Sequence, residues 1–291
     1  MKFKKSITIM VLCIVILSLV ACLTGLFSKG GTGEYEYKTI NNEMVKISGL
    51  GLYKNDSVDV MAQGKASDLV TLVMGIPLLL VSLYFTRKGS FRAKFVLTGT
   101  LGYFLYTFMS YTFLWMYNSF FIIYVALMSL SLFSFILAMM SFDIETITSN
   151  FKENLPVKFI GGFQIFLAFA VGMLWLGKIA PSIFKGTVPM GLGHYTTLVI
   201  QGMDLGIVIP GAIMSGILLI KRNPYGYLLS SVLIVKFITM LTCISAMMIN
   251  QALNNVEIGI APVAIFSMFD LLTIICLVIL LKNTVKKSEV I

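Results

Sequence analysis

Residues 119–142 read SFFIIYVALMSLSLFSFILAMMSF and contain no charged side chain. A helix needs about 20 consecutive apolar residues to cross the core of a bilayer, and this run meets that length. Backbone polar groups inside a bilayer must pair with one another, and the run is far longer than the strands of a membrane barrel. The stretch therefore predicts a transmembrane helix.

The same pattern recurs along the whole chain. Of its 291 residues, 58% are hydrophobic and 12% are charged, and the mean hydropathy is +0.93. A water-soluble domain could not cover so much apolar surface, so we predict an all-α transmembrane helical bundle of about eight spans. The predicted spans are 7–27, 69–86, 95–115, 119–142, 159–183, 197–220, 227–250 and 260–281.

Basic residues in the short connections predict the orientation of the bundle. With eight spans, lysine and arginine gather on one side, and the opposite connections carry few of them, which marks the first side as cytoplasmic. Both termini are then cytoplasmic, and anionic lipid headgroups account for the net charge of +9, so we expect the lipid bilayer and no nucleic acid as a partner. The basic residues on that side are Lys2, Lys4, Lys5, Arg87, Lys88, Arg92, Lys94, Lys152, Lys158, Lys221, Arg222, Lys282, Lys286 and Lys287.

The sizeable polar segment, residues 28–67, falls on the extracytoplasmic side between spans 1 and 2. Residues 34–40 and 43–48 alternate as strands do around Asn41-Asn42, which predicts a β-hairpin, and a third short strand is predicted at 57–61. The segment is too short to bury a core, so we expect a small β-rich cap that packs on the helix ends. It would serve as a structural cap or as a ligand-binding lid. The predicted organisation is a first helix at 1–27, this cap at 28–67 and a seven-helix bundle at 68–291.

The four cysteines lie inside apolar runs without the spacing of a zinc site or a disulfide framework. Cys22 allows a second interpretation. A basic start, an apolar run and Leu19-Val20-Ala21-Cys22 resemble a bacterial lipoprotein signal, in which the cysteine is lipidated after cleavage. Against this interpretation, the apolar run continues to residue 27 and is long enough to span a membrane uncut.

The second and sixth spans contain similar features in the same order. Ser67-Asp68-Leu69, Pro77 and Arg87-Lys88-Gly89 in one span correspond to Met203-Asp204-Leu205, Pro210 and Lys221-Arg222-Asn223 in the other, although the spacings slip by two or three residues. Both spans run in the same direction. The pattern suggests two parallel four-helix repeats, an architecture that transporters use.

Polar groups within the spans are the candidate functional residues, because a buried ionisable group is costly unless it is paired or reaches water. Asp204, Lys236 and Asp270 are the ionisable ones, and Gln201 lies three residues before Asp204 on the same helix face. We predict that these four line an outward-facing polar cavity that binds a ligand. The alternative is an ion pair that fixes helix register, and by depth Lys236 suits Asp270 better than Asp204.

The sequence contains no motif for a metal, haem or nucleotide, so no cofactor is predicted. The chain contains one histidine, His194, which follows Gly191 and Gly193 in a glycine-rich loop. We interpret it as an exposed loop residue rather than a catalytic base. An enzymatic role stays open only as a third alternative.

Two stretches carry a family resemblance: ASDLVTLVMGIPLLLVSLYFTRKGSFRAK at 66–94 and YTTLVIQGMDLGIVIPGAIMSGILLIKRNPYGYLL at 195–229. They resemble a family of uncharacterised bacterial polytopic membrane proteins. The resemblance implies a bacterial plasma membrane and no assigned activity. The sequence thus leaves three functions: transport or binding of a small solute or lipid, a sensory or accessory role through the cap, and a membrane-embedded enzyme.

Overall fold

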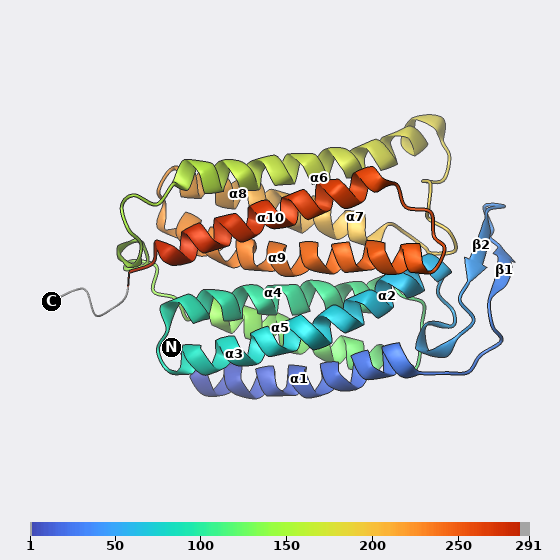
Figure 1. The fold of residues 1–291 in the computed structure, drawn as a ribbon, viewed down its shortest axis with the longest axis horizontal. Helices are drawn as coiled ribbons and strands as arrows, with labels where there is room; N and C mark the ends of the chain where they lie inside the picture. The colour runs from blue at the N-terminus through green and yellow to red at the C-terminus, as the bar shows by residue number, and fades with distance from the viewer. Residues whose placement is uncertain (1, 286–291) are drawn as a thin grey trace.

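The computed structural model describes residues 2–285 as a bundle of helices that lie side by side and alternate in direction (Figure 1). The β-hairpin lies at one end, the hairpin end, and the first and last described residues lie at the other, the terminal end. The elements are α1 (Lys4–Phe27), β1 (Tyr35–Lys38), β2 (Met44–Ile47), α2 (Val58–Val70), α3 (Ile76–Arg87), α4 (Phe91–Phe113), α5 (Phe121–Met140), α6 (Val157–Lys185), α7 (Val199–Met203), α8 (Ile209–Ile220), α9 (Pro224–Leu253) and α10 (Ile260–Lys282).

Within residues 2–285, seven helical segments are long and apolar enough to cross a membrane. They are Lys4–Phe27, Val58–Arg87, Phe121–Met140, Val157–Lys185, Val199–Ile220, Pro224–Leu253 and Ile260–Lys282. The helix α4 has similar length but carries Arg92, Lys94 and many hydroxyl-bearing side chains. It packs between α3, α5 and α9, so most of its surface meets protein, where polar side chains find partners more easily than in lipid.

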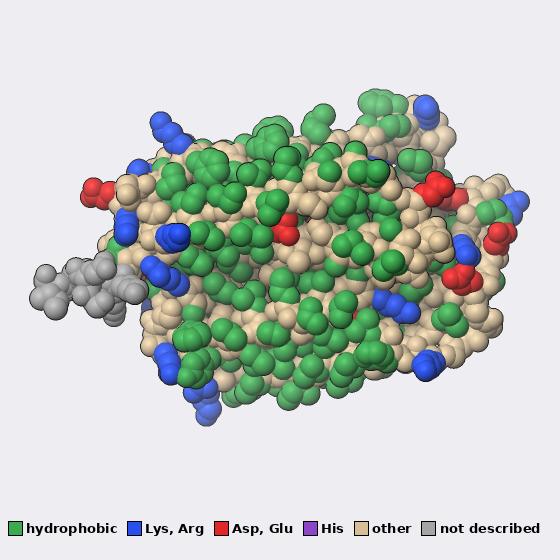
Figure 2. Space-filling model, in the orientation of Figure 1, with side chains coloured by type: hydrophobic (Ala, Val, Ile, Leu, Met, Phe, Trp, Pro, Cys, Tyr) green, Lys and Arg blue, Asp and Glu red, His purple; other side chains and the backbone are tan. Residues whose placement is uncertain are grey.

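The surface of the bundle is apolar along its length and charged at its ends. Figure 2 shows hydrophobic side chains spread over the middle of one face, with mainly Lys and Arg at the terminal end and a mixture of Lys, Arg, Asp and Glu toward the hairpin end. Exposed Ile16, Phe133, Phe169 and Leu271 come from four different helices. Such a belt is what contact with lipid requires. The predicted cytoplasmic Lys286 and Lys287 lie outside the described residues.

Two helical spans contain a π-helical turn immediately before a proline. Thr71–Gly75 joins α2 to α3 ahead of Pro77, and Asp204–Val208 joins α7 to α8 ahead of Pro210. Proline lacks an N–H and its ring crowds the preceding turn, so the helix widens there. Each span therefore combines two helices in series, and both carry the irregularity at the same place relative to the proline.

The hairpin is formed by β1 and β2, which pair antiparallel with Tyr35 opposite Ile47. Its turn includes Asn42, whose φ of 63° lies in the left-handed region that asparagine tolerates. This agrees with the hairpin predicted around Asn41-Asn42. Of the third strand predicted at 57–61, only Ser57 pairs, in an isolated antiparallel bridge with Ile47. The rest of the prediction is wrong, because the Ser57 hydroxyl accepts a hydrogen bond from the Val60 N–H and caps α2. Helix therefore occupies residues 58–67 of the segment predicted to be a β-rich cap.

Cys22 lies within α1, which continues unbroken to Phe27. Its side chain is buried, and α1 packs against α2 and α5. The helix is thus an integral part of the bundle in this structure, and cleavage before Cys22 stays a prediction.

Candidate functional site

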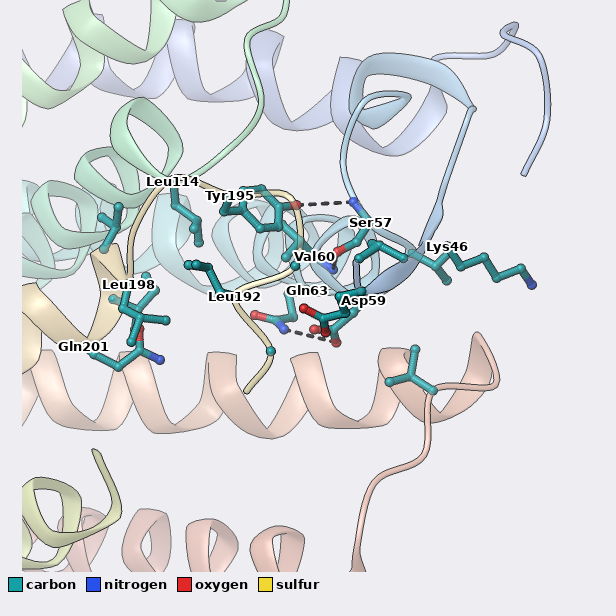
Figure 3. A pocket seen from close by; sticks show the side chains of 18 of the residues that line it. Lys46, Ser57, Asp59, Val60, Gln63, Leu114, Leu192, Tyr195, Leu198 and Gln201 are labelled. Atoms are coloured by element: carbon teal, nitrogen blue, oxygen red, sulfur yellow. Dashed lines mark hydrogen bonds between the residues drawn. The ribbon is translucent and has the colours of Figure 1, made fainter. Parts of the chain in front are cut away.

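A polar cavity opens at the hairpin end of the bundle. This cavity, the vestibule, has a volume of about 450 Å³. Its walls are strand β2, the first two turns of α2, the loop 191–198, the start of α7 and the end of α9. Figure 3 shows Lys46, Asp59, Gln63, Tyr195 and Gln201 around it. The vestibule is therefore formed by segments from both halves of the sequence.

Asp59 is the half-buried carboxylate of the vestibule. Its Oδ1 atom accepts hydrogen bonds from the amides of Gln63, at 3.3 Å, and of Gln251 on α9. Asn250, next to Gln251, donates to the Ala62 carbonyl at 2.6 Å. These contacts tie the end of α9 to the start of α2 and fix one wall of the vestibule.

The loop that carries Tyr195 is anchored by a second carboxylate, Asp56. Its Oδ1 atom accepts from the Tyr195 hydroxyl at 3.1 Å and from the Met116 N–H at 3.0 Å, while the Ser57 N–H donates to the Tyr195 oxygen at 3.2 Å. Burial raises the pKa of Asp56 to about 7, although its two hydrogen-bond donors act in the opposite direction. The adjoining His194 contacts the Asn55 carbonyl at 2.9 Å, which indicates an anchoring role for this histidine.

A second cavity, the inner cavity, lies deeper between the helices and has a volume of about 280 Å³. Helices α4, α6, α7, α8 and α9 form its walls, mostly with Leu, Val, Ile, Met and aromatic side chains. Gln63, Leu114 and Ile200 line both this cavity and the vestibule. The two cavities therefore adjoin, and these three residues lie between the inner cavity and the vestibule at the hairpin end.

Asp204 is the half-buried acidic residue of the inner cavity, at the first position of the second π-helical turn. Its Oδ1 atom accepts from the Tyr106 hydroxyl of α4 at 2.8 Å, and its Oδ2 atom accepts from the Trp175 Nε1–H of α6 at 2.9 Å. One carboxylate thus joins three helices. Each oxygen accepts one hydrogen bond, so the carboxylate is held from two sides.

Lys236 on α9 also faces this space and is only 7% exposed. Its Nζ atom lies 4.2 Å from the centre of the Tyr106 ring, a cation–π distance. Within residues 2–285, the structure shows no hydrogen-bond acceptor or ion-pair partner for this ammonium. Lys236, Tyr106 and Val208 also line a third cavity of about 150 Å³, so Lys236 stands between the inner cavity and the third one.

The structure brings together some of the residues predicted for the site and separates others. Asp204 and Lys236 share the inner cavity, whereas the buried Gln201 faces the vestibule. Asp270 lines neither cavity. Its Oδ2 atom accepts from Thr242 at 3.0 Å. The predicted pairing of Lys236 with Asp270 is wrong, because Thr242 lies about 120° around α9 from Lys236.

Tyr106 and Trp175 were not predicted as site residues, although both hydrogen-bond to Asp204. Aromatic residues within a span look like ordinary apolar packing. A signal was nevertheless present, because tryptophan favours the membrane interfaces and Trp175 lies well inside the span predicted at 159–183. A buried tryptophan needs a partner for its N–H, which suggests a nearby acceptor.

A further carboxylate, Asp68, is buried in the first half of the bundle. Its Oδ2 atom accepts from the Tyr53 hydroxyl at 2.6 Å and its Oδ1 atom from the Tyr111 hydroxyl at 2.9 Å. It is 1% exposed and lines none of the three cavities. We therefore assign it to packing.

The described residues contain no cluster of three or more His, Cys, Asp or Glu that could hold a metal ion. Comparison of the chain with protein-family models, curated proteins and solved structures gives no match. The resemblance to uncharacterised bacterial membrane proteins therefore stays a prediction.

Proposed function

We propose that this polytopic membrane protein binds a small, largely apolar solute or lipid in the inner cavity and moves it between the hairpin end and the middle of the bilayer. The observation that carries the proposal is the series of adjoining cavities. The vestibule meets the inner cavity at Gln63, Leu114 and Ile200, and the inner cavity meets the third one at Lys236. Ligand sites are typically such concave, mostly apolar spaces with a few well-placed polar groups.

The proposal places the protein in a bacterial plasma membrane, with the hairpin end extracytoplasmic and both termini cytoplasmic. The lysines and arginines at the terminal end support this orientation. The vestibule would then open to the outside. Its wall at β2 makes the hairpin part of the entrance, so the cap would act as a lid on the ligand path as well as a cover for the helix ends.

We further propose that the bundle consists of two parallel four-helix repeats, α1 to α5 and α6 to α10. The two π-helical turns support this division, since each precedes an Ile-Pro pair in the second span of its half. A widened turn beside a proline is a weak point in a helix and a common place for a functional hinge. The turn at Asp204–Val208 borders the inner cavity, so a bend there would change its width.

Thiol labelling from the hairpin side tests the proposal. In a Cys13→Ser background the remaining cysteines are buried, which leaves little reactive thiol. Ala168→Cys places a thiol on the inner cavity, and Ser131→Cys places one in the closely packed first half as a matched control, since both positions are buried within spans. The protein is reconstituted in sealed liposomes of known orientation and exposed to the anionic, membrane-impermeant reagent sulfonatoethyl methanethiosulfonate.

We expect Ala168→Cys to react at least tenfold faster than Ser131→Cys when the reagent is on the hairpin side. Equal, slow labelling of both thiols would contradict an accessible cavity. Faster labelling from the terminal side would contradict the direction of access.

A sensory role through the cap is the second candidate, because residues 43–46 of the hairpin line the vestibule and Lys46 forms an ion pair with Glu34 at 2.5 Å. A vestibule ligand could displace the hairpin without entering the bundle. The two candidates differ in one measurement. Filling the inner cavity with Ala168→Phe abolishes solute transfer under the first proposal and leaves a cap-mediated response unchanged under the second.

A further inference from the structure

The unpartnered ammonium of Lys236 carries information about the ligand. A lysine that is 7% exposed has lost most of its hydration, and burial of a charged group is costly without a compensating partner. Its three N–H donors have no acceptor among the described residues, and its Nζ atom lies over the faces of the Tyr106 and Phe237 rings, at 4.2 and 5.6 Å from their centres. The side chain therefore presents unused donors to the space that it lines.

Asp204 does not meet this need. It lines the same cavity, but its two oxygens already hold the donors of Tyr106 and Trp175, and it forms no ion pair with Lys236. Tyr106 lies between the two charges, since its hydroxyl donates to Asp204 and its ring faces Lys236. The carboxylate thus fixes the position of the tyrosine, and the lysine points its charge at the cavity.

The rest of the cavity wall is apolar. Leu167, Val171, Met240, Ile244 and Met247 are representative, and they offer no hydrogen-bonding side chain. At about 30 Å³ for each water-sized group, a volume of about 280 Å³ holds roughly nine groups. A medium-length alkyl chain or an apolar ring system of similar size would fill it.

A cationic ligand does not suit this arrangement. Aromatic faces beside a carboxylate are the usual surroundings of a quaternary ammonium, and Tyr106, Trp175 and Asp204 would otherwise fit one. Here the Lys236 ammonium already occupies the face of the Tyr106 ring at 4.2 Å. A second cation would meet its charge directly.

We infer that the inner cavity binds an anionic amphiphile, with its charged oxygen group at the ammonium of Lys236 and its apolar body along the walls of α6 and α9. This inference rests on the proposed function and adds the class of ligand. The shared chemistry is an anionic oxygen group on a medium-length apolar body, whether a fatty-acid-like solute or a lipid supplies it.

Three decyl compounds with the same chain and different heads test the inference. Decanesulfonate carries a fixed negative charge, decanol is neutral and decyltrimethylammonium carries a fixed positive charge. The reporter is the Ala168→Cys thiol in the Cys13→Ser background, in lipid nanodiscs, with an uncharged maleimide as reagent. The concentration of each compound that halves the labelling rate is corrected for its partition into protein-free nanodiscs.

We expect decanesulfonate to protect the thiol at a concentration at least about tenfold below that of decanol, as one charge-assisted hydrogen bond would give. Decyltrimethylammonium should be the weakest of the three. The variant Lys236→Met keeps the length of the side chain and removes the charge, so it should abolish the preference for the anion. Lys236→Arg keeps the positive charge and should retain the preference. This variant therefore shows whether the lost preference in Lys236→Met comes from the missing charge or from a change at this position in general.

The outcomes separate the two proposals. Equal protection by decanol and decanesulfonate, or an anion preference that survives Lys236→Met, overturns the assignment of the ligand class and leaves the binding cavity intact. Strongest protection by decyltrimethylammonium overturns it as well. If none of the three compounds protects a thiol that the maleimide does label, the proposed function fails together with the inference.

Discussion

Asp68 and Asp204 are two carboxylates in the two proline-containing spans, with a similar hydrogen-bonding pattern and different surroundings. Each accepts one hydrogen bond on each oxygen, from Tyr53 and Tyr111 in the first half and from Tyr106 and Trp175 in the second. Asp68 is 1% exposed among close-packed side chains, whereas Asp204 borders a cavity of about 280 Å³. A buried acid is therefore a candidate for ligand binding when it borders a cavity, as Asp204 does, and not when other side chains surround it, as with Asp68.

The prolines show that these two acids are not equivalent positions. Asp204 lies six residues before Pro210, and the residue six before Pro77 is Thr71. The Thr71 hydroxyl contacts the Tyr103 hydroxyl at 2.9 Å, much as Asp204 contacts Tyr106 one helical turn further along α4. Aligned on the prolines, Asp68 falls opposite Gln201 and Lys88 falls opposite Lys221. The contact at the start of the π-helical turn therefore joins two hydroxyls in the first half, and a hydroxyl and a carboxylate in the second.

Replacing each carboxylate by alanine should give the largest difference in lost stability between the two halves. Asp68→Ala leaves the buried Tyr53 hydroxyl without an acceptor and leaves the Tyr111 hydroxyl only the Gly64 carbonyl, at 3.0 Å, so it should lower the free energy of unfolding by about 2–3 kcal/mol. Asp204→Ala should lower it by only about 1–2 kcal/mol, because Tyr106 and Trp175 can turn to water in the cavity. Unfolding in mixed micelles of increasing sodium dodecyl sulfate content measures both. A larger loss for Asp204→Ala would remove the distinction between a packed acid and a cavity acid.

Replacing a buried alanine by phenylalanine should give a smaller difference in lost stability between the two halves. Ala138 is buried in the core of the first half, so Ala138→Phe should destabilise the protein by about 1–3 kcal/mol. Ala168 borders the inner cavity, so Ala168→Phe should change stability by less than about 1 kcal/mol while it fills that space. Thermal unfolding of the two variants compares them. Similar destabilisation by both would mean that the second half is packed as tightly as the first.

The smallest effect concerns the hairpin end, in the connection between α1 and α2. The pKa of Asp56 is about 7 in the fold against 3.8 for an ordinary aspartate. Between these values the folded segment holds a proton that the unfolded one has lost, so its stability falls as pH rises and stays low above about pH 7. Hydrogen exchange of residues 48–57 should therefore quicken from pH 5 to pH 8 beyond the intrinsic chemical rate, with little change in global unfolding.

Asp56→Asn is the matched control for that pH dependence, because the amide keeps an acceptor for Tyr195 and does not titrate. We expect its exchange, corrected for the intrinsic rate, to be flat over the same range. A wild-type protein with equally flat corrected exchange would show that ionisation of Asp56 does not control the segment.

The sequence was informative where one residue type decides the structure. Apolar runs predicted the helices, Asn41-Asn42 predicted the hairpin turn, and charges within spans identified Asp204 and Lys236. It failed where a hydroxyl competes for the backbone, as at Ser57, whose capping contact turns a predicted strand into the start of α2. Local preference alone could not reveal that contact.

The cavities could not be predicted, because they depend on how faces of different helices meet. Periodicity places Lys236 and Asp270 inside the bundle but cannot say that Lys236 turns toward Tyr106 and that Asp270 turns toward Thr242. The sequence suggests that Trp175 is an ordinary packing residue, and only the structure shows that its Nε1–H donates to Asp204. The shared wall of the vestibule and the inner cavity likewise joins α2, α4 and α7, which are distant in the sequence.

Hydroxyl-radical footprinting of the unaltered protein in nanodiscs measures whether water reaches the inner cavity, because the radicals form from water. Trp175 and Met240 line the inner cavity, and Tyr103 and Phe104 are buried in the first half. We expect rapid oxidation of the first pair and protection of the second, read by mass spectrometry. Equal protection of all four side chains would show that the second half is as dry as the first and that the inner cavity is closed to water.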